Sequence, residues 1–345
     1  MARSVAVLLC LALCAGSCLA VTDAELYGTA GVTPQAVRQG SIGSCYFYAT
    51  VASIARAHPE VLRRAILRDR GGDVSVQFAD GETEAVSLKD VQFARASSYD
   101  ESDGLWVAVL LRGFAQRTLR KAMADWVERA ALGPVTGRVA AAMLGNDLVL
   151  TAYDRAIRSQ VDQVGGLDRQ RLKARLRQEL ESVPAPDSWK DSAVEYVDST
   201  GFFDSLSEQV KANGELFGAY RAVGQGGIVG RAMTAFLGPS ETRRVLNATE
   251  ALAAMDAALR RGAAVVASTG DSTWQAIASR AGTSGGAQAE EWYIARHAYS
   301  VLAVNQSART VTLRNPWGDH PKPDGEFTIP ADVFAAGYGE IDMSD

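Results

Sequence analysis

Hydrophobic residues recur with helical spacing in the segment that begins at Cys45. One stripe at positions i, i+4, i+7 and i+8 consists of Phe47, Val51, Ile54 and Ala55. This spacing is typical of one face of an α-helix. The helix is expected to end at Ala57, because Pro59 disfavours helical backbone at the residue before it. Cys45 therefore falls in or just before the first helical turn.

Alternating or continuous apolar residues predict two strands near the C-terminal end of the sequence. The first run is H-A-Y-S-V-L-A-V, starting at His297, and the second is T-V-T-L-R, starting at Thr310. The short segment N-Q-S-A-R joins them, which favours an antiparallel hairpin. In such a hairpin His297, at the start of one strand, lies close to Asn315, at the end of the other.

A segment of about a hundred residues, 118–220, has helical patterns that neither of these elements explains. Its apolar positions with spacings of three and four are Leu119, Met123, Trp126, Val127, Ala130, Leu172, Leu176 and Leu180. Gly133-Pro134 and Pro184 are expected to end helices, and Asp168 to cap one. The basic residues of the second helix are expected on a solvated face: Arg169, Arg171, Lys173, Arg175 and Arg177. We interpret the segment as a helical insertion that elaborates the structure; the alternative is a lid or a propeptide-like regulator.

The first twenty residues have the pattern of an export signal. Arg3 precedes an apolar run from Val5 to Ala15, and Cys18-Leu19-Ala20 offers small residues for cleavage before Val21. Eleven apolar residues make a helix of roughly 16 Å, which is too short to cross a bilayer of roughly 30 Å. The protein is therefore expected to be secreted or periplasmic, and membrane-attached only if Cys18 is lipidated.

Composition limits the classes of function. The chain has 345 residues, 47% hydrophobic and 22% charged, which fits one large domain or two subdomains. A formal net charge of −5 gives no electrostatic case for binding nucleic acid or anionic lipid. Removal of residues 1–20 would leave Cys45 as the sole cysteine, so an exported protein would carry a free thiol into an oxidising compartment.

Cys45 can be a buried structural thiol or a nucleophile. At a helix start, free N–H groups and the helix dipole stabilise a thiolate and lower the thiol pKa. A thiolate nucleophile needs an imidazole, and the chain has three histidines. His58 and His320 fit a helix end and a polar loop, whereas His297 can be oriented by Asn315, the pairing that a cysteine nucleophile requires.

Three blocks resemble the protease core of the calpain family, a branch of the papain-like cysteine peptidases. They are P-Q-A-V-R-Q-G-S-I-G-S-C-Y-F-Y-A-T-V-A-S-I-A (34–55), R-H-A-Y-S-V-L-A-V (296–304) and L-R-N-P-W-G (313–318). The resemblance implies an α+β fold of two subdomains with a helical insertion. The helical subdomain would span 21–240, and a β-rich subdomain, 241–345, would carry His297 and Asn315.

The resemblance also implies roles for five residues. Cys45 would be the nucleophile, His297 its ion-pair partner and later general acid, and Asn315 the group that orients the imidazole. Gln39 would donate its side-chain amide to the oxyanion beside the Cys45 backbone N–H. Trp317 would shield the hydrogen bond between His297 and Asn315 from water.

Calcium is a separate question, because the family core holds calcium in acidic loops. Asp324 and Glu326 match one acidic pair of the family. Two carboxylates fall short of the six or more oxygens that Ca²⁺ takes, so they make at most a partial site. No cofactor is expected to be required, and loss of calcium dependence is favoured over its retention.

These features predict a calpain-like cysteine endopeptidase, acting as a monomer on protein or peptide substrates through an acyl-enzyme. Two alternatives stay open. One is a catalytically silent relative that only binds peptides, and the other is a transglutaminase- or acyltransferase-type thiol enzyme. The intact Gln39, Cys45, His297 and Asn315 argue against the first. The second would form the same acyl-enzyme and would differ only in the molecule that accepts the acyl group from it.

Overall fold

The computed structural model describes residues 21–69, 74–131, 169–182, 186–199, 217–282, 293–319 and 325–345. The chain divides into two compact units. Unit 1 comprises residues 1–114 and 225–345, and unit 2 comprises residues 115–224. The boundary falls inside helix α6 (Trp106–Ala131). All of the candidate site residues that the structure describes belong to unit 1.

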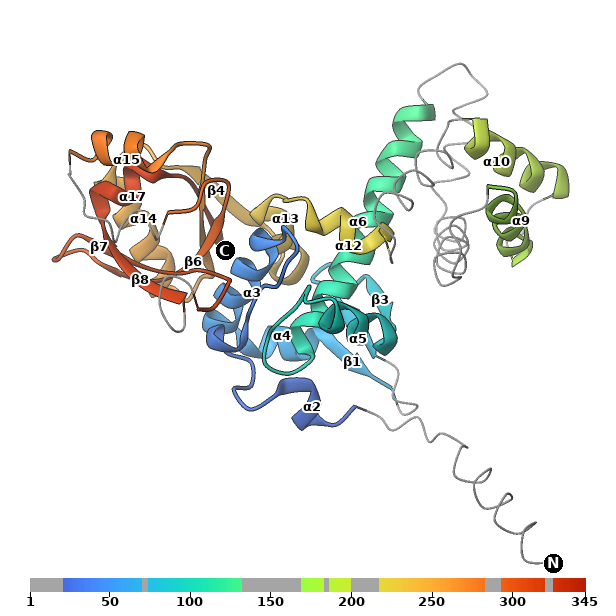
Figure 1. Ribbon diagram of the computed structural model, residues 1–345, viewed down its shortest axis with the longest axis horizontal. Helices are drawn as coiled ribbons and strands as arrows, with labels where there is room; N and C mark the ends of the chain where they lie inside the picture. The colour runs from blue at the N-terminus through green and yellow to red at the C-terminus, as the bar shows by residue number, and fades with distance from the viewer. Residues whose placement is uncertain are drawn as a thin grey trace, which may run out of the picture. The chain divides into compact units, whose positions relative to one another are not determined.

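A six-stranded sheet forms one part of unit 1 (Figure 1). Its strand order is β4-β9-β5-β6-β7-β8, and every neighbouring pair is antiparallel. The strands are β4 (Ser240–Arg244), β5 (Val265–Thr269), β6 (Ala298–Asn305), β7 (Thr310–Arg314), β8 (Glu326–Pro330) and β9 (Tyr338–Ser344). The pair β6–β7 is the hairpin predicted from the sequence, and its register places Ser300 opposite Arg314.

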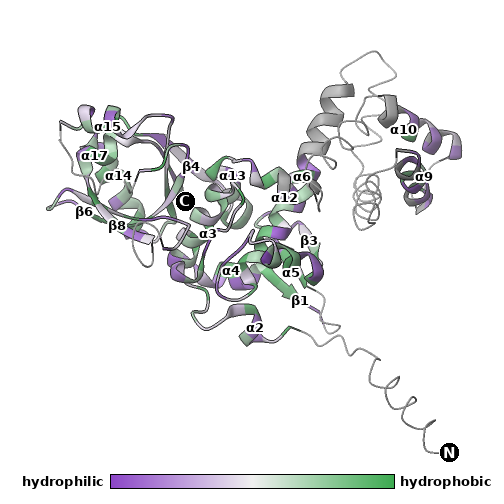
Figure 2. Cartoon of the chain, viewed as in Figure 1, coloured by the Kyte–Doolittle hydropathy of each residue, from purple (hydrophilic) through white to green (hydrophobic). Residues whose placement is uncertain are grey.

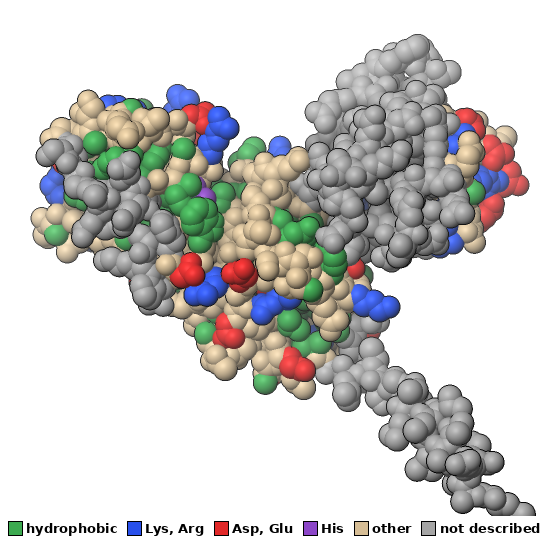
Figure 3. Space-filling model, in the orientation of Figure 1, with side chains coloured by type: hydrophobic (Ala, Val, Ile, Leu, Met, Phe, Trp, Pro, Cys, Tyr) green, Lys and Arg blue, Asp and Glu red, His purple; other side chains and the backbone are tan. Residues whose placement is uncertain are grey.

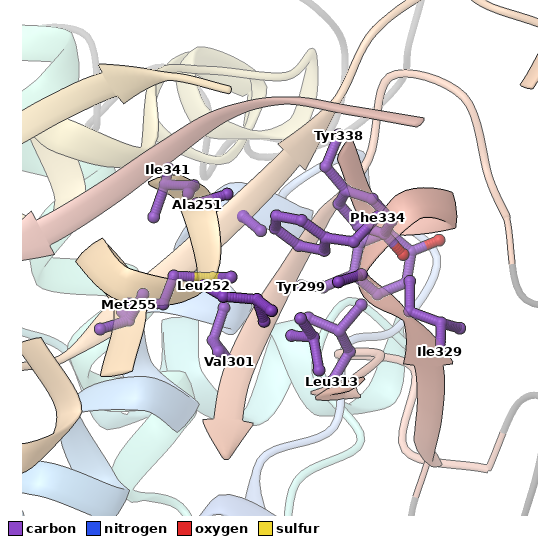
Figure 4. Packing of buried hydrophobic residues seen from close by; sticks show 14 of the residues in the cluster. Ala251, Leu252, Met255, Tyr299, Val301, Leu313, Ile329, Phe334, Tyr338 and Ile341 are labelled. Atoms are coloured by element: carbon purple, nitrogen blue, oxygen red, sulfur yellow. The ribbon is translucent and has the colours of Figure 1, made fainter. Parts of the chain in front are cut away.

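Helices cover one face of this sheet and enclose a hydrophobic core. They are α14 (Ala248–Arg260), α15 (Trp274–Arg280) and α17 (Ala331–Gly337). Figure 4 shows Leu252 and Met255 of α14 facing Val301 and Leu313 of the sheet, and all four are buried. Removing such side chains from water is the main force that holds helix and sheet together.

Helix α3 (Cys45–Ala57) contacts β5 and β6, and side-chain alternation in β6 shows that it does so from the opposite face. Tyr299 belongs to the core beneath α14, whereas the next residue, Ser300, donates from Oγ to the Ala49 carbonyl of α3 at 2.8 Å. Successive strand residues point to opposite faces, so the sheet separates α3 from α14. The helix begins and ends where the sequence predicts, and its predicted apolar stripe is buried.

The rest of unit 1 surrounds α3 with short elements. A small sheet of order β1-β2-β3 is antiparallel throughout. The elements are α2 (Asp23–Tyr27), η1 (Pro34–Ala36), α4 (Pro59–Ala65), β1 (Ile66–Arg68), β2 (Val74–Gln77), β3 (Thr83–Val86), α5 (Leu88–Ala96) and α13 (Val229–Leu237). Ten consecutive residues of α3, 46–55, are buried, so this helix is central to unit 1 rather than lying on its surface.

Unit 2 is helical in its described residues. Besides the end of α6, it contains α9 (Arg169–Glu179), η2 (Leu180–Ser182), α10 (Asp187–Ser199) and α12 (Phe217–Gly224). Leu176 and Leu180 are buried, as the predicted stripe requires. Residues 133–134, Asp168 and Pro184 lie outside the described residues.

The basic face of α9 differs from the prediction. Figure 2 shows a strongly hydrophilic helix, but two of its cations contact α10 rather than only solvent. Lys173 pairs with Glu195 at 2.7 Å, and Arg177 with Asp191 at 2.5 Å. The prediction of a solvated face therefore holds only in part, because helical spacing shows which residues share a face, not that an acidic helix lies beside it.

Helices and an antiparallel sheet together confirm the α+β class. The finer prediction of two protease subdomains, split near residue 240, stays a prediction. In the described part of the chain, no helix has the length and apolarity needed to cross a membrane. The predicted export signal, residues 1–20, lies outside the described residues.

We expect Ser53→Ala to destabilise unit 1. Ser53 Oγ donates to the Val265 carbonyl at 2.9 Å and accepts from the Val265 N–H at 2.7 Å, so it ties the middle of α3 to β5. Loss of a buried partner of this kind costs about 1–3 kcal/mol. Urea denaturation would measure the fall in free energy of unfolding. The exposed Ser307→Ala is the matched control, and an equal, negligible effect of both changes would contradict the proposed tie.

Candidate active site

A cleft of about 920 Å³ lies in unit 1. Four short segments and Trp317 line it: residues 39–46, 225–229, 268–271 and 294–298 contribute lining residues. Cys45, His297, Gln39 and Trp317 are all among these residues, although more than 250 positions separate Gln39 and Cys45 from His297 and Trp317. Figure 3 shows, on one face of unit 1, a histidine side chain at the surface beside a group of hydrophobic side chains.

Cys45 is the first residue of α3, and its side chain is a partly exposed free thiol. Burial raises the pKa of this thiol, and backbone N–H groups of Ala298, Tyr46 and Cys45 itself partly offset that rise. The position of Cys45 at a helix start, taken alone, predicts a lowered pKa. That expectation was wrong in direction, because desolvation of the thiolate outweighs the nearby N–H groups.

His297 and Asn315 are joined directly. His297 Nε2 lies 2.9 Å from Asn315 Oδ1, and both side chains are buried. The Trp317 backbone N–H also donates to this Oδ1, at 3.1 Å, which fixes the carboxamide with its oxygen toward the imidazole. An oxygen acceptor requires Nε2 to carry the proton, so in the neutral ring Nδ1 is the nitrogen that can accept one.

The hairpin explains why these two residues meet. His297 directly precedes β6 and Asn315 directly follows β7, at the same end of an antiparallel pair. The backbone of Asn315 is held in turn, since its N–H donates to the Gly325 carbonyl at 2.8 Å. The pairing predicted from the two strand patterns is therefore present in the structure.

Two residues that were not predicted from the sequence contact His297, one at its backbone and one at its ring. Thr269 Oγ1 accepts from the His297 N–H at 2.9 Å, and the Thr269 N–H donates to the His297 carbonyl at 2.9 Å. The Tyr299 ring stands edge-on to the His297 ring, with centroids 4.9 Å apart. Thr269 ends a different strand, β5, and no spacing in the sequence connects it to His297. Tyr299 could have been predicted as a neighbour of His297, since it lies two positions further along the chain, in β6.

Trp317 also lies against His297, with ring centroids 5.0 Å apart, and is half-buried. The rings of Tyr299 and Trp317 therefore both contact the imidazole. This position is the one that shielding of the His297–Asn315 hydrogen bond from water would require, and the shielding itself stays a prediction.

Gln39 is held at the edge of the cleft through its backbone and its side chain. Its N–H donates to the Pro316 carbonyl at 2.8 Å, and its Nε2 donates to the Ile42 carbonyl at 2.6 Å. The Ile42 acceptor fixes the orientation of the carboxamide, with nitrogen toward Ile42. Since an amide nitrogen carries two hydrogens, the second N–H can donate to a group bound in the cleft.

The wall of the cleft beside Cys45 is built from glycine and an aromatic ring. A Cβ atom at Gly227 would lie 2.4 Å from the Tyr46 ring, so only glycine fits there. The charged residues among the cleft lining are Asp271 and Arg296, which form an ion pair with each other. The described lining is otherwise neutral, which suits an uncharged segment of a ligand.

The residues considered for calcium give no site that can be described. Asp324, one of the two carboxylates considered for calcium, lies outside the described residues, and so does His320. Glu326 Oε1 accepts from Gln35 Nε2 at 2.8 Å. Among the described residues, no group of three or more His, Cys, Asp or Glu side chains could hold a metal ion. His58 occupies the N-cap position of α4 without a side-chain capping hydrogen bond. Its Nδ1 lies 3.8 Å from Glu60 Oε1, outside the cleft lining.

Comparison with known proteins agrees with the predicted family resemblance. The family model described as calpain family cysteine protease matches residues 186–329. This stretch is less than half of the chain; it contains His297 and Asn315, whereas Gln39 and Cys45 lie before it. The match confirms the predicted resemblance to calpain family cysteine proteases over residues 186–329.

Other comparisons are less informative. A search of curated proteins finds no match. Among solved structures, a crystal structure of PepW from Lactobacillus rhamnosis HN001, a selenomethionine derivative, is 12% identical. The alignment covers 90% of this chain and 79% of that chain, with a TM-score of 0.32. A TM-score this low does not establish a shared fold.

Proposed function

We propose that this calpain-like chain is a cysteine endopeptidase that cleaves peptide bonds through Cys45, His297 and Asn315. The observation that carries the proposal is the His297–Asn315 hydrogen bond of 2.9 Å in the lining of the cleft that also contains Cys45. A cysteine peptidase is the coarser function that the family match supports. The individual roles of Cys45, His297, Asn315 and Gln39 are part of the proposal.

The raised pKa of Cys45 defines what His297 must do. A desolvated thiol with a raised pKa is a poor nucleophile at neutral pH when it stands alone. Transfer of its proton to His297 Nδ1 gives a thiolate beside an imidazolium, and each charge then stabilises the other. Asn315 contributes by accepting from Nε2, which keeps Nδ1 as the proton acceptor and holds the ring.

The reaction then follows the acyl-transfer pattern. The Cys45 thiolate attacks the substrate carbonyl carbon, and the new oxyanion accepts from the Gln39 amide and the Cys45 backbone N–H. The tetrahedral intermediate collapses as imidazolium Nδ1 donates its proton to the leaving amine. A thioester to Cys45 remains, and water, deprotonated by His297, hydrolyses it to a free carboxylic acid and restores the thiol.

Export and independence of metal are further parts of the proposal. An N-terminal signal in residues 1–20 would place the enzyme in a secreted or periplasmic compartment. Calcium independence is proposed because Asp324 and Glu326 supply too few oxygens for a closed calcium site. We further propose that the enzyme acts as a monomer on protein or peptide substrates.

The function is tested by incubating the purified protein with casein, an unfolded substrate. We expect new peptides from the wild-type protein, none from Cys45→Ala, and unchanged cleavage in excess chelator. Each expectation follows from a thiol mechanism that needs no metal. Mass spectrometry of the products provides the measurement.

Three results of that experiment would contradict the proposal. Binding of casein without cleavage indicates a catalytically silent relative. Incorporation of an added primary amine into casein, without new peptides, indicates a transglutaminase- or acyltransferase-type enzyme. Cleavage that stops on chelation contradicts calcium independence alone.

The proposed roles of Gln39 and Asn315 predict different kinetic defects. Gln39→Ala should lower kcat by on the order of 10²–10³ with KM nearly unchanged, because its amide acts on the oxyanion that develops in the transition state. Alkylation of Cys45 by iodoacetamide builds no oxyanion, so this variant should alkylate normally. Asn315→Ala frees the imidazole to rotate and should lower turnover and alkylation together.

Gln35→Ala is the matched control for these variants. Gln35 lies four residues before Gln39, is exposed, and bonds to Glu326 outside the cleft lining. It should keep both rates. A near-normal kcat in Gln39→Ala would show that the oxyanion site has been assigned to the wrong residue.

A further inference from the structure

Asp100 is a buried carboxylate outside the candidate cleft, with 1% of its surface exposed. It lies in the loop between α5 and α6. Its Oδ1 accepts from Tyr48 Oη at 3.1 Å and from Ser102 Oγ at 2.7 Å, and its Oδ2 accepts from Arg95 at 3.1 Å. The proposed mechanism uses none of these residues, yet they form one connected polar network.

Two members of this network reach the residues that carry the proposed chemistry. Tyr48 is on α3, one turn after Cys45. Ser102 Oγ accepts from the backbone N–H of Arg38, the residue before Gln39, at 2.9 Å. Asp100 therefore joins the nucleophile helix to the chain segment that carries Gln39.

Backbone hydrogen bonds also join the segment that carries Gln39 to the loop that carries Asp100. Gln39 and Asp100 form an antiparallel bridge. The Glu101 N–H donates to the Arg38 carbonyl at 3.1 Å, and the Ser41 N–H donates to the Ser98 carbonyl at 2.6 Å. The two segments, 38–41 and 98–102, thus run side by side.

Their approach is close enough to require glycine. A Cβ atom at Gly40 would lie 2.0 Å from the Ser98 carbonyl oxygen. Ser98 itself has a positive φ of 53°, a conformation that is uncommon for a residue other than glycine. The loop that carries Asp100 is therefore fitted tightly against the turn that leads from Gln39 to Cys45.

Arg95 supplies the charge that lets a carboxylate remain here. The guanidinium donates to Asp100 and to the carbonyls of Ser102 and Gly104, the last at 3.0 Å. Burial raises the pKa of Asp100, whereas Ser102, Arg95 and Tyr48 lower it. Burying a charge pair is a weak means of stabilisation, but a fully satisfied polar network selects one geometry.

We propose that Asp100 is a positioning residue, which sets the Gln39 amide and the Cys45 backbone N–H in register as two donors to one oxyanion. The inference rests on the proposed function, because the two groups act as oxyanion donors only in that function. Asp100 touches no substrate. It acts through Tyr48 on the helix that carries Cys45, and through Ser102 and the paired backbone on Gln39.

Asp100→Asn tests the proposal with little change in size. One amide oxygen can still accept from Tyr48 and Ser102, but an NH₂ group then faces the Arg95 guanidinium, donor against donor. We expect kcat on a peptide substrate to fall about 10- to 100-fold with KM nearly unchanged, as misplacement of a reacting group by about 1 Å would cause. Iodoacetamide alkylation of Cys45 should stay near the wild-type rate.

A double-mutant cycle separates positioning from a general loss of structure. In a Gln39→Ala background, Asp100→Asn should have little further effect on kcat, because the donor through which it acts is gone. Asp90→Asn is the matched control: Asp90 also forms a carboxylate–arginine pair, partly buried, with Arg112 at 2.6 Å. It is expected to keep kcat. Tyr48→Phe, which removes one hydroxyl, replaces Asp100→Asn if the latter fails to fold.

Hydrogen exchange of the backbone amides in residues 38–44 gives a readout that does not need activity. Exchange should quicken in Asp100→Asn and not in Asp90→Asn. Equal kcat losses with and without Gln39, an unchanged kcat, or exchange unaffected by Asp100→Asn would each overturn the inference. A wild-type protein with no peptidase activity would refute the proposed function, and the exchange result would then decide the positioning inference alone.

Discussion

Burial of helix α3 on all sides is the constraint on which the candidate site depends. A helix in this position cannot turn polar groups to solvent, so two of its hydroxyls bond to neighbouring elements, while Thr50 donates to the Tyr46 carbonyl within the helix. Ser53 bonds to both backbone groups of Val265 in β5, and Tyr48 bonds to Asp100. From the sheet side, Ser300 bonds to the α3 backbone. These bonds fix the helix against rotation and sliding, and they fix the position of Cys45 at its first residue.

The same burial works against the proposed role of Cys45 as a nucleophile. A helix start offers N–H groups to a thiolate, but desolvation acts more strongly here and raises the Cys45 pKa. Reactivity at neutral pH must therefore come from a group outside α3. The β6–β7 hairpin brings such a group, His297, with its tautomer set by Asn315 and its ring in contact with Tyr299 and Trp317. The proposed nucleophile and base are thus carried by different elements that meet across one cleft.

Sequence patterns predicted the local elements of this site well. The bounds of α3 follow from a hydrophobic stripe and a His-Pro stop, and the His297–Asn315 pairing follows from two strands joined by a short turn. Both depend on interactions between residues near each other in the chain. The lowered thiol pKa was predicted wrongly, because desolvation depends on the packing of distant segments around residue 45.

Longer-range features left no readable signal. Thr269 reaches His297 from another strand, and Asp100 reaches Gln39 across some sixty positions, through loops with irregular backbone. The ion pairs between α9 and α10 were missed for the same reason, since periodicity describes one helix and not its neighbour. Positions that a tertiary contact determines can be recognised only once that contact is known.

The most direct test of the account is the pH dependence of Cys45 alkylation by iodoacetamide in the wild-type protein, His297→Ala and a control, His58→Ala, whose histidine lies outside the cleft. We expect fast alkylation near pH 7 in the wild type and the control. In His297→Ala, alkylation should be slow at that pH and should rise only at a pH above the usual thiol range of about 8.5, because burial raises the pKa of a thiol that has no imidazole partner. Identical pH profiles in the wild type and His297→Ala would contradict the claim that His297 activates Cys45.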